Sequence, residues 1–280
     1  MTKIKIFMFT AILFTVSNKL FAFDSLLFKP LTANHLEARI GFFYQQNTEK
    51  LRLDIGHSLD MYEFISNENL QIRAGGDFFI LSRLRSEGKM KFPVETADYY
   101  FGLNCTGNFK SKLFSSLFEN TSFRLRAGHI SSHLVDGYTF QRDDTTLFIQ
   151  EPFVYSREFF DLIFSGTLLI NDAVFRFYFG GTTIFSTIPR DINKFVGQMG
   201  LEYQYPFLKS TKAIVGLDLK ADNLNKKDFL NESMQIGLLF NLYKNIGISL
   251  NYYYYNGYSI HGMFYNQKEK YKGFGIQINY

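Results

Sequence analysis

The sequence has no tryptophan, one cysteine and five prolines among its 280 residues. Because Cys105 is the only cysteine, the chain cannot form an internal disulfide, and other interactions must hold an exported fold together. After residue 22, no apolar run reaches the length of about 20 residues that a membrane-spanning helix needs. These absences exclude a disulfide-stapled scaffold and a helical membrane protein.

Aromatic residues are abundant instead, with 33 phenylalanines and 18 tyrosines, and the mean hydropathy is −0.09. An aromatic-rich chain of balanced polarity is typical of a transmembrane β-barrel, whose outer face meets lipid and whose inner face meets water. The alternative fold is a soluble secreted β-sandwich, which also alternates apolar and polar residues.

Residues 1–22 have the layout of a secretory signal peptide. Two lysines precede an apolar run at 6–16, and a cleavage site follows Ala22. The run is too short to cross about 30 Å of hydrocarbon as a helix. We expect the mature chain to begin at Phe23, with 27 basic and 26 acidic residues, so the formal charge falls from +4 to +1. A nearly neutral chain gives no case for nucleic-acid binding.

The remaining sequence alternates with a period of two, as in Phe175, Phe177 and Phe179. It predicts one all-β domain at 23–280, a single antiparallel transmembrane barrel of about twelve strands, with ten to fourteen as the range. Residues 23–34 are expected to form a periplasmic lead or to line the lumen. The predicted strands are 35–46, 49–59, 68–82, 95–106, 122–134, 151–164, 173–183, 196–206, 213–222, 232–243, 245–256 and 270–280.

The predicted connections are long at one end and short at the other, as expected of outer-membrane barrels. The N-terminus is placed in the periplasm. The predicted outer loops are 83–94, 135–150, 184–195, 223–231 and 257–269. The predicted inner turns are 165–172, 207–212 and the region of Lys244. The 107–121 connection is longer than this scheme expects of an inner turn.

The last predicted strand alternates Phe274, Ile276, Ile278 and Tyr280 with smaller or polar residues. It resembles the final strand of barrels that the outer-membrane assembly machinery inserts, which ends in an aromatic residue. We therefore expect that machinery to recognise the strand through Ile278 and Tyr280. The expected location is the bacterial outer membrane, with outer-membrane lipids as partners.

Two segments that flank one predicted outer loop carry the candidate site. His129 and Ser131 are two residues apart, so they share a strand face with the apolar Leu125, which is the expected lipid-facing side. A nucleophilic serine needs a base and a group that orients the base, and Glu158 or Asp136 would orient His129. The candidate catalytic residues are therefore Ser131, His129 and Glu158.

The His-x-Ser spacing resembles that of some outer-membrane lipid hydrolases, which usually have asparagine after the serine, where this chain has Ser132. The structural alternative assigns these residues to a rim that contacts lipid headgroups. That predicted rim cluster consists of His133, Asp136, Tyr155 and Arg157.

No metal site is predicted. His129 and His133 would share a face and could chelate zinc, but no third ligand follows at a fixed spacing. Asp143, Asp144 and Glu151 could bind calcium in a loop, although adjacent acids in outer loops are more often solvated. No cofactor is therefore expected, and calcium remains an open alternative.

Two further groups of residues are assigned by face. Arg124, Arg126 and Arg176 are expected to point inward, where they would line an anion-selective pore or form ion pairs in the lumen. The tyrosine run at 252–255 is expected to form an interfacial girdle in place of tryptophan.

Segments 27–33, 128–133 and 155–158 resemble a bacterial family known as a domain of unknown function, the twelve-oh-seven family. The resemblance implies an envelope protein and supplies no activity. Val135 and Gly137 depart from the family pattern, which favours a glycine and an acidic residue there.

Three classes of function follow from the sequence. The first is a non-enzymatic barrel, either a structural envelope protein or a narrow pore. The second is a phospholipid or lipopolysaccharide deacylase that uses Ser131 and His129. The third is a soluble exported binding protein.

Overall fold

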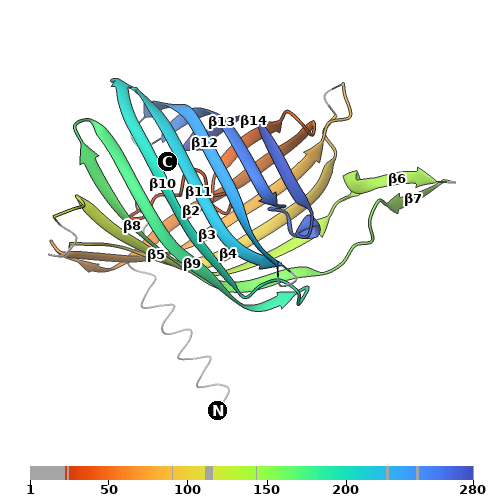
Figure 1. The fold of residues 1–280 in the computed structure, drawn as a ribbon, viewed down its shortest axis with the longest axis horizontal. Helices are drawn as coiled ribbons and strands as arrows, with labels where there is room; N and C mark the ends of the chain where they lie inside the picture. Colours follow the sequence, from red (N-terminus) through yellow and green to blue (C-terminus); the bar gives the residue numbers. More distant parts are fainter. Residues whose placement is uncertain are drawn as a thin grey trace, which may run out of the picture.

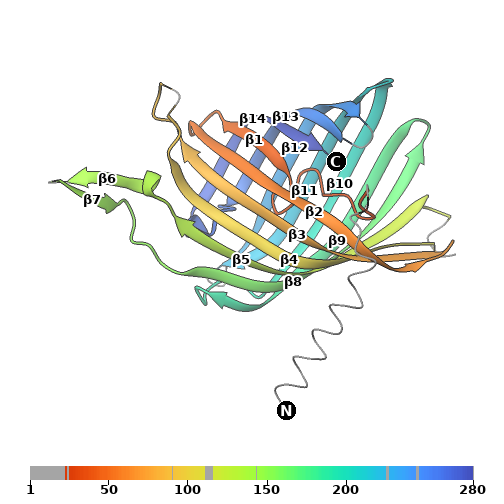
Figure 2. The same ribbon diagram turned by 180° about the vertical axis from the view of Figure 1, so that it is seen from behind.

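The computed structural model describes residues 23, 25–89, 91–110, 116–142, 144–224, 227–243 and 246–279, so the predicted signal peptide, Asp143, Lys244 and Tyr280 lie outside the described residues. Twelve antiparallel strands close into one barrel (Figures 1 and 2), which confirms the predicted fold class and strand number. In the described part of the chain, no helix is long and apolar enough to cross a membrane.

The barrel closes where β1 pairs with β14. Two short strands, β6 (Thr139–Arg142) and β7 (Thr145–Phe148), form a separate hairpin that projects beyond the barrel (Figures 1 and 2). Single 3₁₀ turns occur at η1 (Asp136–Tyr138) and η2 (Gly262–Phe264). The barrel strands are β1 (Ile40–Gln45), β2 (Lys50–Ser66), β3 (Leu70–Arg85), β4 (Val94–Phe109), β5 (Asn120–Leu134), β8 (Tyr155–Ile170), β9 (Ala173–Ile188), β10 (Phe195–Leu208), β11 (Thr211–Leu224), β12 (Lys227–Tyr243), β13 (Ile246–Tyr258) and β14 (Lys268–Asn279).

The two ends of the barrel differ in their connections. The end that we call the long-loop end carries 135–154, 189–194 and 259–267. The opposite, short-turn end carries tight turns such as 171–172 and 209–210. This is the asymmetry that the sequence predicted.

Several predicted boundaries are wrong because polar residues continue the strands. The predicted outer loop 223–231 belongs mostly to β11 and β12, which remain paired up to Leu224 and Lys227. Asn223 donates to Asp228 across this ladder at 2.8 Å, so cross-strand hydrogen bonds replace apolar packing there. Likewise, the predicted turn 165–172 contains only residues 171–172 outside the strands.

The first barrel strand begins at Ile40 and not at residue 35, because the preceding segment lies inside the barrel. We call residues 25–39 the lumen segment (Figures 1 and 2). Its Leu31 side chain is fully buried. The segment bonds to strands all around the wall: Leu27 N to Asp60 on β2 at 2.8 Å, Thr32 N to Glu202 on β10 at 2.5 Å, Lys220 on β11 to Asn34 at 2.6 Å, and Ser233 on β12 to the carbonyl of Ala33 at 2.7 Å.

The inward arginines form ion pairs, which decides between the two predicted roles. Arg124 donates two hydrogen bonds to Glu37 of the lumen segment, both at 2.7 Å. Arg126 pairs with Asp161 at 2.8 Å, and Arg176 lies 3.3 Å from Glu202. The carboxylates that neutralise these guanidinium groups come from the wall and from the lumen segment, so the charges hold the segment in place.

The tyrosine run does not form the predicted girdle as a unit. Tyr253 and Tyr255 are buried in the lumen, with 3% and 4% of their surface exposed. Only Tyr252 and Tyr254 remain on the outward face, where Tyr252 contacts Phe274 with ring centroids 5.2 Å apart. A strand with a period of two divides any run of four between its faces.

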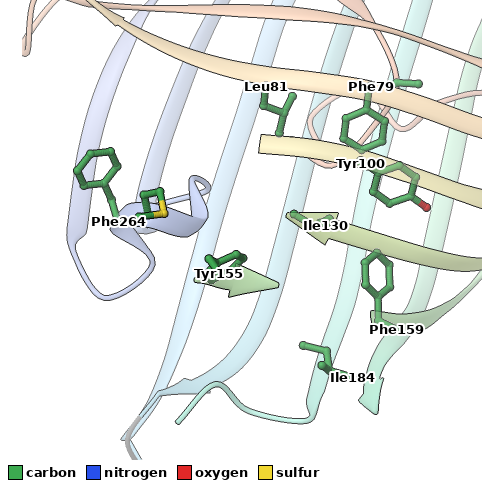
Figure 3. Packing of buried hydrophobic residues seen from close by; sticks show 10 residues of the cluster. Phe79, Leu81, Tyr100, Ile130, Tyr155, Phe159, Ile184 and Phe264 are labelled. Carbon is green, nitrogen blue, oxygen red and sulfur yellow. The ribbon is translucent and has the colours of Figure 1, made fainter. Parts of the chain in front are cut away.

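An apolar cluster fills the lumen near the long-loop end (Figure 3). Phe79 and Tyr100 stack with centroids 4.2 Å apart, and Phe264 of η2 packs into the same cluster. The loop that carries η2 is fixed by Asp98, which accepts hydrogen bonds from Gly262 N at 2.7 Å and contacts His261 Nδ1 at 2.6 Å. This packing makes β4, β5 and β8 a rigid support for the residues on their outward faces.

Candidate functional site

The candidate site lies on the outward faces of β5 and β8, close to the long-loop end. In the antiparallel register His129 is opposite Glu158, and Ser131 is opposite Ser156. Directly paired residues of antiparallel strands lie on the same face of the sheet. Ile130, which lies between His129 and Ser131 on β5, is buried in the lumen. Successive side chains of a strand point to opposite faces, so His129 and Ser131 point away from the lumen, as the sequence predicted.

His129 and Glu158 are joined by a direct contact. The Nδ1 atom of His129 lies 2.9 Å from Oε1 of Glu158, and the two side chains are 28% and 32% exposed. An ionised carboxylate only accepts hydrogen bonds, so Nδ1 carries a proton, and Nε2 is the nitrogen with the lone pair in the neutral imidazole. Phe101 on β4 packs against the imidazole, with ring centroids 4.8 Å apart. The pair therefore fixes both the orientation and the tautomer of a potential base.

Two serines that the sequence analysis did not select also bind Glu158. Ser156 donates to Glu158 Oε1 at 3.1 Å, and the Ser186 hydroxyl makes a further side-chain hydrogen bond to the same carboxylate. Ser156 is two residues from Glu158 on β8, so the period of two could have identified it. No sequence pattern identifies Ser186, because it lies on β9.

A β-bulge on β9 explains the position of Ser186. Glu158 is opposite Ser186, but the next residue, Phe159, is opposite Ile184, so Phe185 is an extra residue in the ladder. Ile184 is buried in the lumen, and without the extra residue Ser186 would face the same way. The bulge turns Ser186 outward to Glu158. Bulges that re-aim a side chain are common beside active sites.

Ser131 lies beside this pair on the same outward face. Two residues of strand place its Cα about 7 Å from that of His129. We use the name outward polar patch for the five residues His129, Ser131, Ser156, Glu158 and Ser186. The patch is bordered by exposed aromatic side chains, among them Phe101 at 52% exposure, Phe160 at 50% and Phe185 at 58%.

The predicted rim cluster is divided between the two faces of the wall. His133 is exposed on the outward face, and its ring lies 5.9 Å from that of Tyr99. Tyr155 is buried in the apolar cluster of the lumen, and Arg157 lies over the ring of Phe159 at 5.7 Å. Asp136 begins η1 beyond the end of β5. The outward polar patch therefore lacks Tyr155 and Arg157.

No group of three or more histidine, cysteine, aspartate or glutamate residues is arranged to hold a metal ion in the described ranges. Of the three acids considered for calcium, Asp143 lies outside those ranges, while Glu151 is exposed. Calcium binding in this loop stays a prediction.

Most of the chain is similar in fold to several solved outer-membrane barrels. Outer membrane phospholipase A from Escherichia coli matches with 13% identity and a TM-score of 0.48, over 94% of this chain and 96% of that chain. The Salmonella typhi outer membrane phospholipase dimer with bound calcium matches with 13% identity and a TM-score of 0.49, over 89% and 93%. The β domain of the Bordetella autotransporter BrkA matches with 12% identity and a TM-score of 0.46, over 86% and 96%.

No curated protein sequence matches the chain. A family described as a protein of unknown function, DUF1207, matches residues 91–280. The matched range includes the segments 128–133 and 155–158 and therefore the four patch residues on β5 and β8. It begins after the segment 27–33. Because the match covers more than half of the sequence, this chain is a member of the DUF1207 family, as its resemblance to that family predicted.

Proposed function

We propose that this protein is an outer-membrane lipid acyl hydrolase in which Ser131 is the nucleophile, His129 the base and Glu158 the residue that positions the base. The observation that carries the proposal is the 2.9 Å contact between His129 and Glu158 on the outward face, beside Ser131. No ordered cofactor is required for this chemistry.

The membrane location in this proposal rests on the outward surface. Large apolar side chains are exposed on successive strands, for example Phe177, Phe179, Ile276 and Leu250, which water would disfavour and lipid would accept. The long-loop end would face outside the cell. The C-terminal strand β14 exposes Phe274 and Ile276 in the same way, which supports recognition by the outer-membrane assembly machinery.

The position of the outward polar patch, close to the long-loop end, lets the barrel tolerate polar side chains on its lipid face. A lysine or arginine on the lipid face of a barrel destabilises the fold by about 2–4 kcal/mol at the bilayer midplane. Acidic residues destabilise it less, and the cost decreases towards the membrane interface. Near the interface this cost falls to about 0–1 kcal/mol. The functional role of the patch therefore rests on the direct contact between His129 and Glu158 and not on the energy of placing charge in lipid.

The proposed reaction is a two-step ester hydrolysis. Ser131 Oγ attacks the ester carbonyl carbon while His129 Nε2 takes the hydroxyl proton. The tetrahedral adduct collapses, the bond to the lipid alcohol breaks, and His129 returns the proton to the leaving alkoxide. A water molecule that is deprotonated by the same imidazole then attacks the acyl-serine, the bond to Ser131 Oγ breaks as the imidazolium returns the proton to that oxygen, and the fatty acid is released. Glu158 stabilises the imidazolium in both steps.

The proposal is tested by fatty-acid release from phospholipid vesicles and from lipopolysaccharide, with the mature barrel refolded in detergent, with and without calcium. We expect release from at least one of the two lipids. If neither lipid were cleaved with or without calcium, the hydrolase proposal would be wrong, and a structural role for the barrel would be favoured. The filled lumen favours such a closed wall over an open pore, because Leu31 and Phe264 lie fully buried within it.

A second prediction concerns the positioning role of Glu158. Glu158→Gln keeps a similar shape, but its amide can bond either imidazole tautomer and carries no charge. We expect kcat to fall by about 10²–10⁴-fold with little change in KM, as for other triads that lose the carboxylate. Ser186→Ala, which removes one bond to Glu158, should reduce kcat by only about tenfold. Equal losses in the two variants would argue against a special role for the carboxylate.

A further inference from the structure

A separate cavity of about 670 Å³ lies inside the barrel at the short-turn end, far along the strands from the outward polar patch. The lumen segment supplies part of its lining, including Lys29 and Thr32. The rest comes from residues next to the tight turns, among them Lys212 on β11 and Asn241 on β12. This volume lies in the range of pockets that hold small-molecule ligands, about 300–1,000 Å³.

Positive charge dominates the described lining. The cationic side chains are Lys29, Arg39, Arg176 and Lys212, and Glu202 is the one carboxylate among the described residues that line the cavity. Glu202 is already engaged by Arg176 at 3.3 Å and by Thr32 N at 2.5 Å. Burial lowers the pKa of Lys29, and the positive charges of Lys212 and Arg176 lower it further. A bound anion would relieve this repulsion.

Side-chain amides of Asn108, Asn120, Gln204, Asn241, Gln277 and Asn279 also line the cavity. The side-chain carbonyl oxygens of Asn108 and Gln277 are buried and have no hydrogen-bond partner among the described residues. Gln277 is only 8% exposed. Each side-chain amide offers both donors and an acceptor, so this lining suits a ligand with several hydroxyl groups.

We propose that this cavity binds an acidic saccharide, that is, a sugar that carries a carboxylate or a phosphate. The anionic group would pair with Lys29 and Lys212, and the sugar hydroxyls would bond to the side-chain amides of the lining. In the orientation proposed above, the ligand would enter from the periplasmic side. The site is separate from the outward polar patch, so it does not depend on the hydrolase.

The test uses the full mature chain in detergent and isothermal titration with four probes: glucuronate, glucose 6-phosphate, glucose and inorganic phosphate. We expect both acidic sugars to bind. Glucose lacks the anionic group and inorganic phosphate lacks the sugar hydroxyls, so each should bind at least about tenfold more weakly. Binding of neither acidic sugar would overturn the proposal. Equal binding of inorganic phosphate would also overturn it and show a general anion site.

Charge variants locate the ligand within the barrel. Lys29→Gln and Lys212→Gln should each weaken binding of the acidic sugars by about tenfold, because each removes one charge-assisted hydrogen bond to the anionic group. Lys209→Gln removes the same charge from the exposed turn beside β11, outside the lining, and should leave binding unchanged. If Lys209→Gln weakened binding as much as Lys212→Gln, the effect would come from the general charge of that end, and the cavity would not be the site.

Discussion

Ser131→Ala is expected to reduce fatty-acid release by at least about 10³-fold while the barrel still folds. The alanine removes the nucleophilic oxygen. The side chain lies on the outward surface and not in the packed lumen, so the substitution leaves no internal cavity. Folding is checked by heat-modifiable migration on a gel, and activity is measured on the lipid that the wild-type protein cleaves.

His129→Ala should cause a loss of similar size, and the double variant should lose little more, because nucleophile and base act as one unit. Two matched controls separate chemistry from surface effects. His133→Ala changes an exposed histidine on the same face of β5, and Ser66→Ala changes an exposed serine at the end of β2. Both should stay within about twofold of the wild type. Full activity in Ser131→Ala would rule out Ser131 as the nucleophile.

The second large effect is expected in the lumen. Glu37→Ala removes the carboxylate that accepts two hydrogen bonds from Arg124 and leaves a buried guanidinium without its main partner. Breaking a buried ion pair from one side costs about 3–5 kcal/mol. We expect this loss in the free energy of unfolding, measured by urea titration of the refolded barrel in detergent.

The control for Glu37 is a pair with more water around it. Glu63→Ala breaks a 3.0 Å pair with Arg73, but the Glu63 side chain is 26% exposed, so a loss of about 0–1 kcal/mol is expected. If both variants lost a comparable amount of unfolding free energy, burial of the Glu37 pair would not strengthen its contribution to stability.

The stabilisation by Glu37 should depend on pH in a predictable way. Burial by itself would raise the pKa of this carboxyl, but Arg124 and Arg126 outweigh it and lower the pKa from 4.5 to about 2. For a lowered pKa, the stabilisation is complete above the unfolded-state value and is lost as the pH falls through the folded-state value. The difference between the wild type and Glu37→Ala should therefore be complete above about pH 5.5, shrink steadily as the pH falls below 4.5, and vanish only below about pH 2.

The sequence correctly predicted which of these side chains point into the lumen and which point outward. Alternation placed His129 and Ser131 outward and Arg124 and Arg126 inward, because a strand sends successive side chains to opposite faces whatever its neighbours are. The same rule, applied more strictly, would have placed Tyr253 and Tyr255 in the lumen. Strand ends were predicted less well, because cross-strand partners such as Asn223 and Asp228 extend a ladder beyond its apolar residues.

Other features depended on contacts between distant parts of the chain. The sequence alone determined a barrel with an apolar outside, a charged inside and a histidine and serine on one outward face, since these follow from local periodicity. Only the tertiary structure decided that Glu158 is opposite His129, that a bulge turns Ser186 to the same carboxylate, and that residues 25–39 lie in the lumen and pair with the wall. Register, bulges and lumen packing arise from pairings between residues far apart in sequence, and no local pattern encodes them.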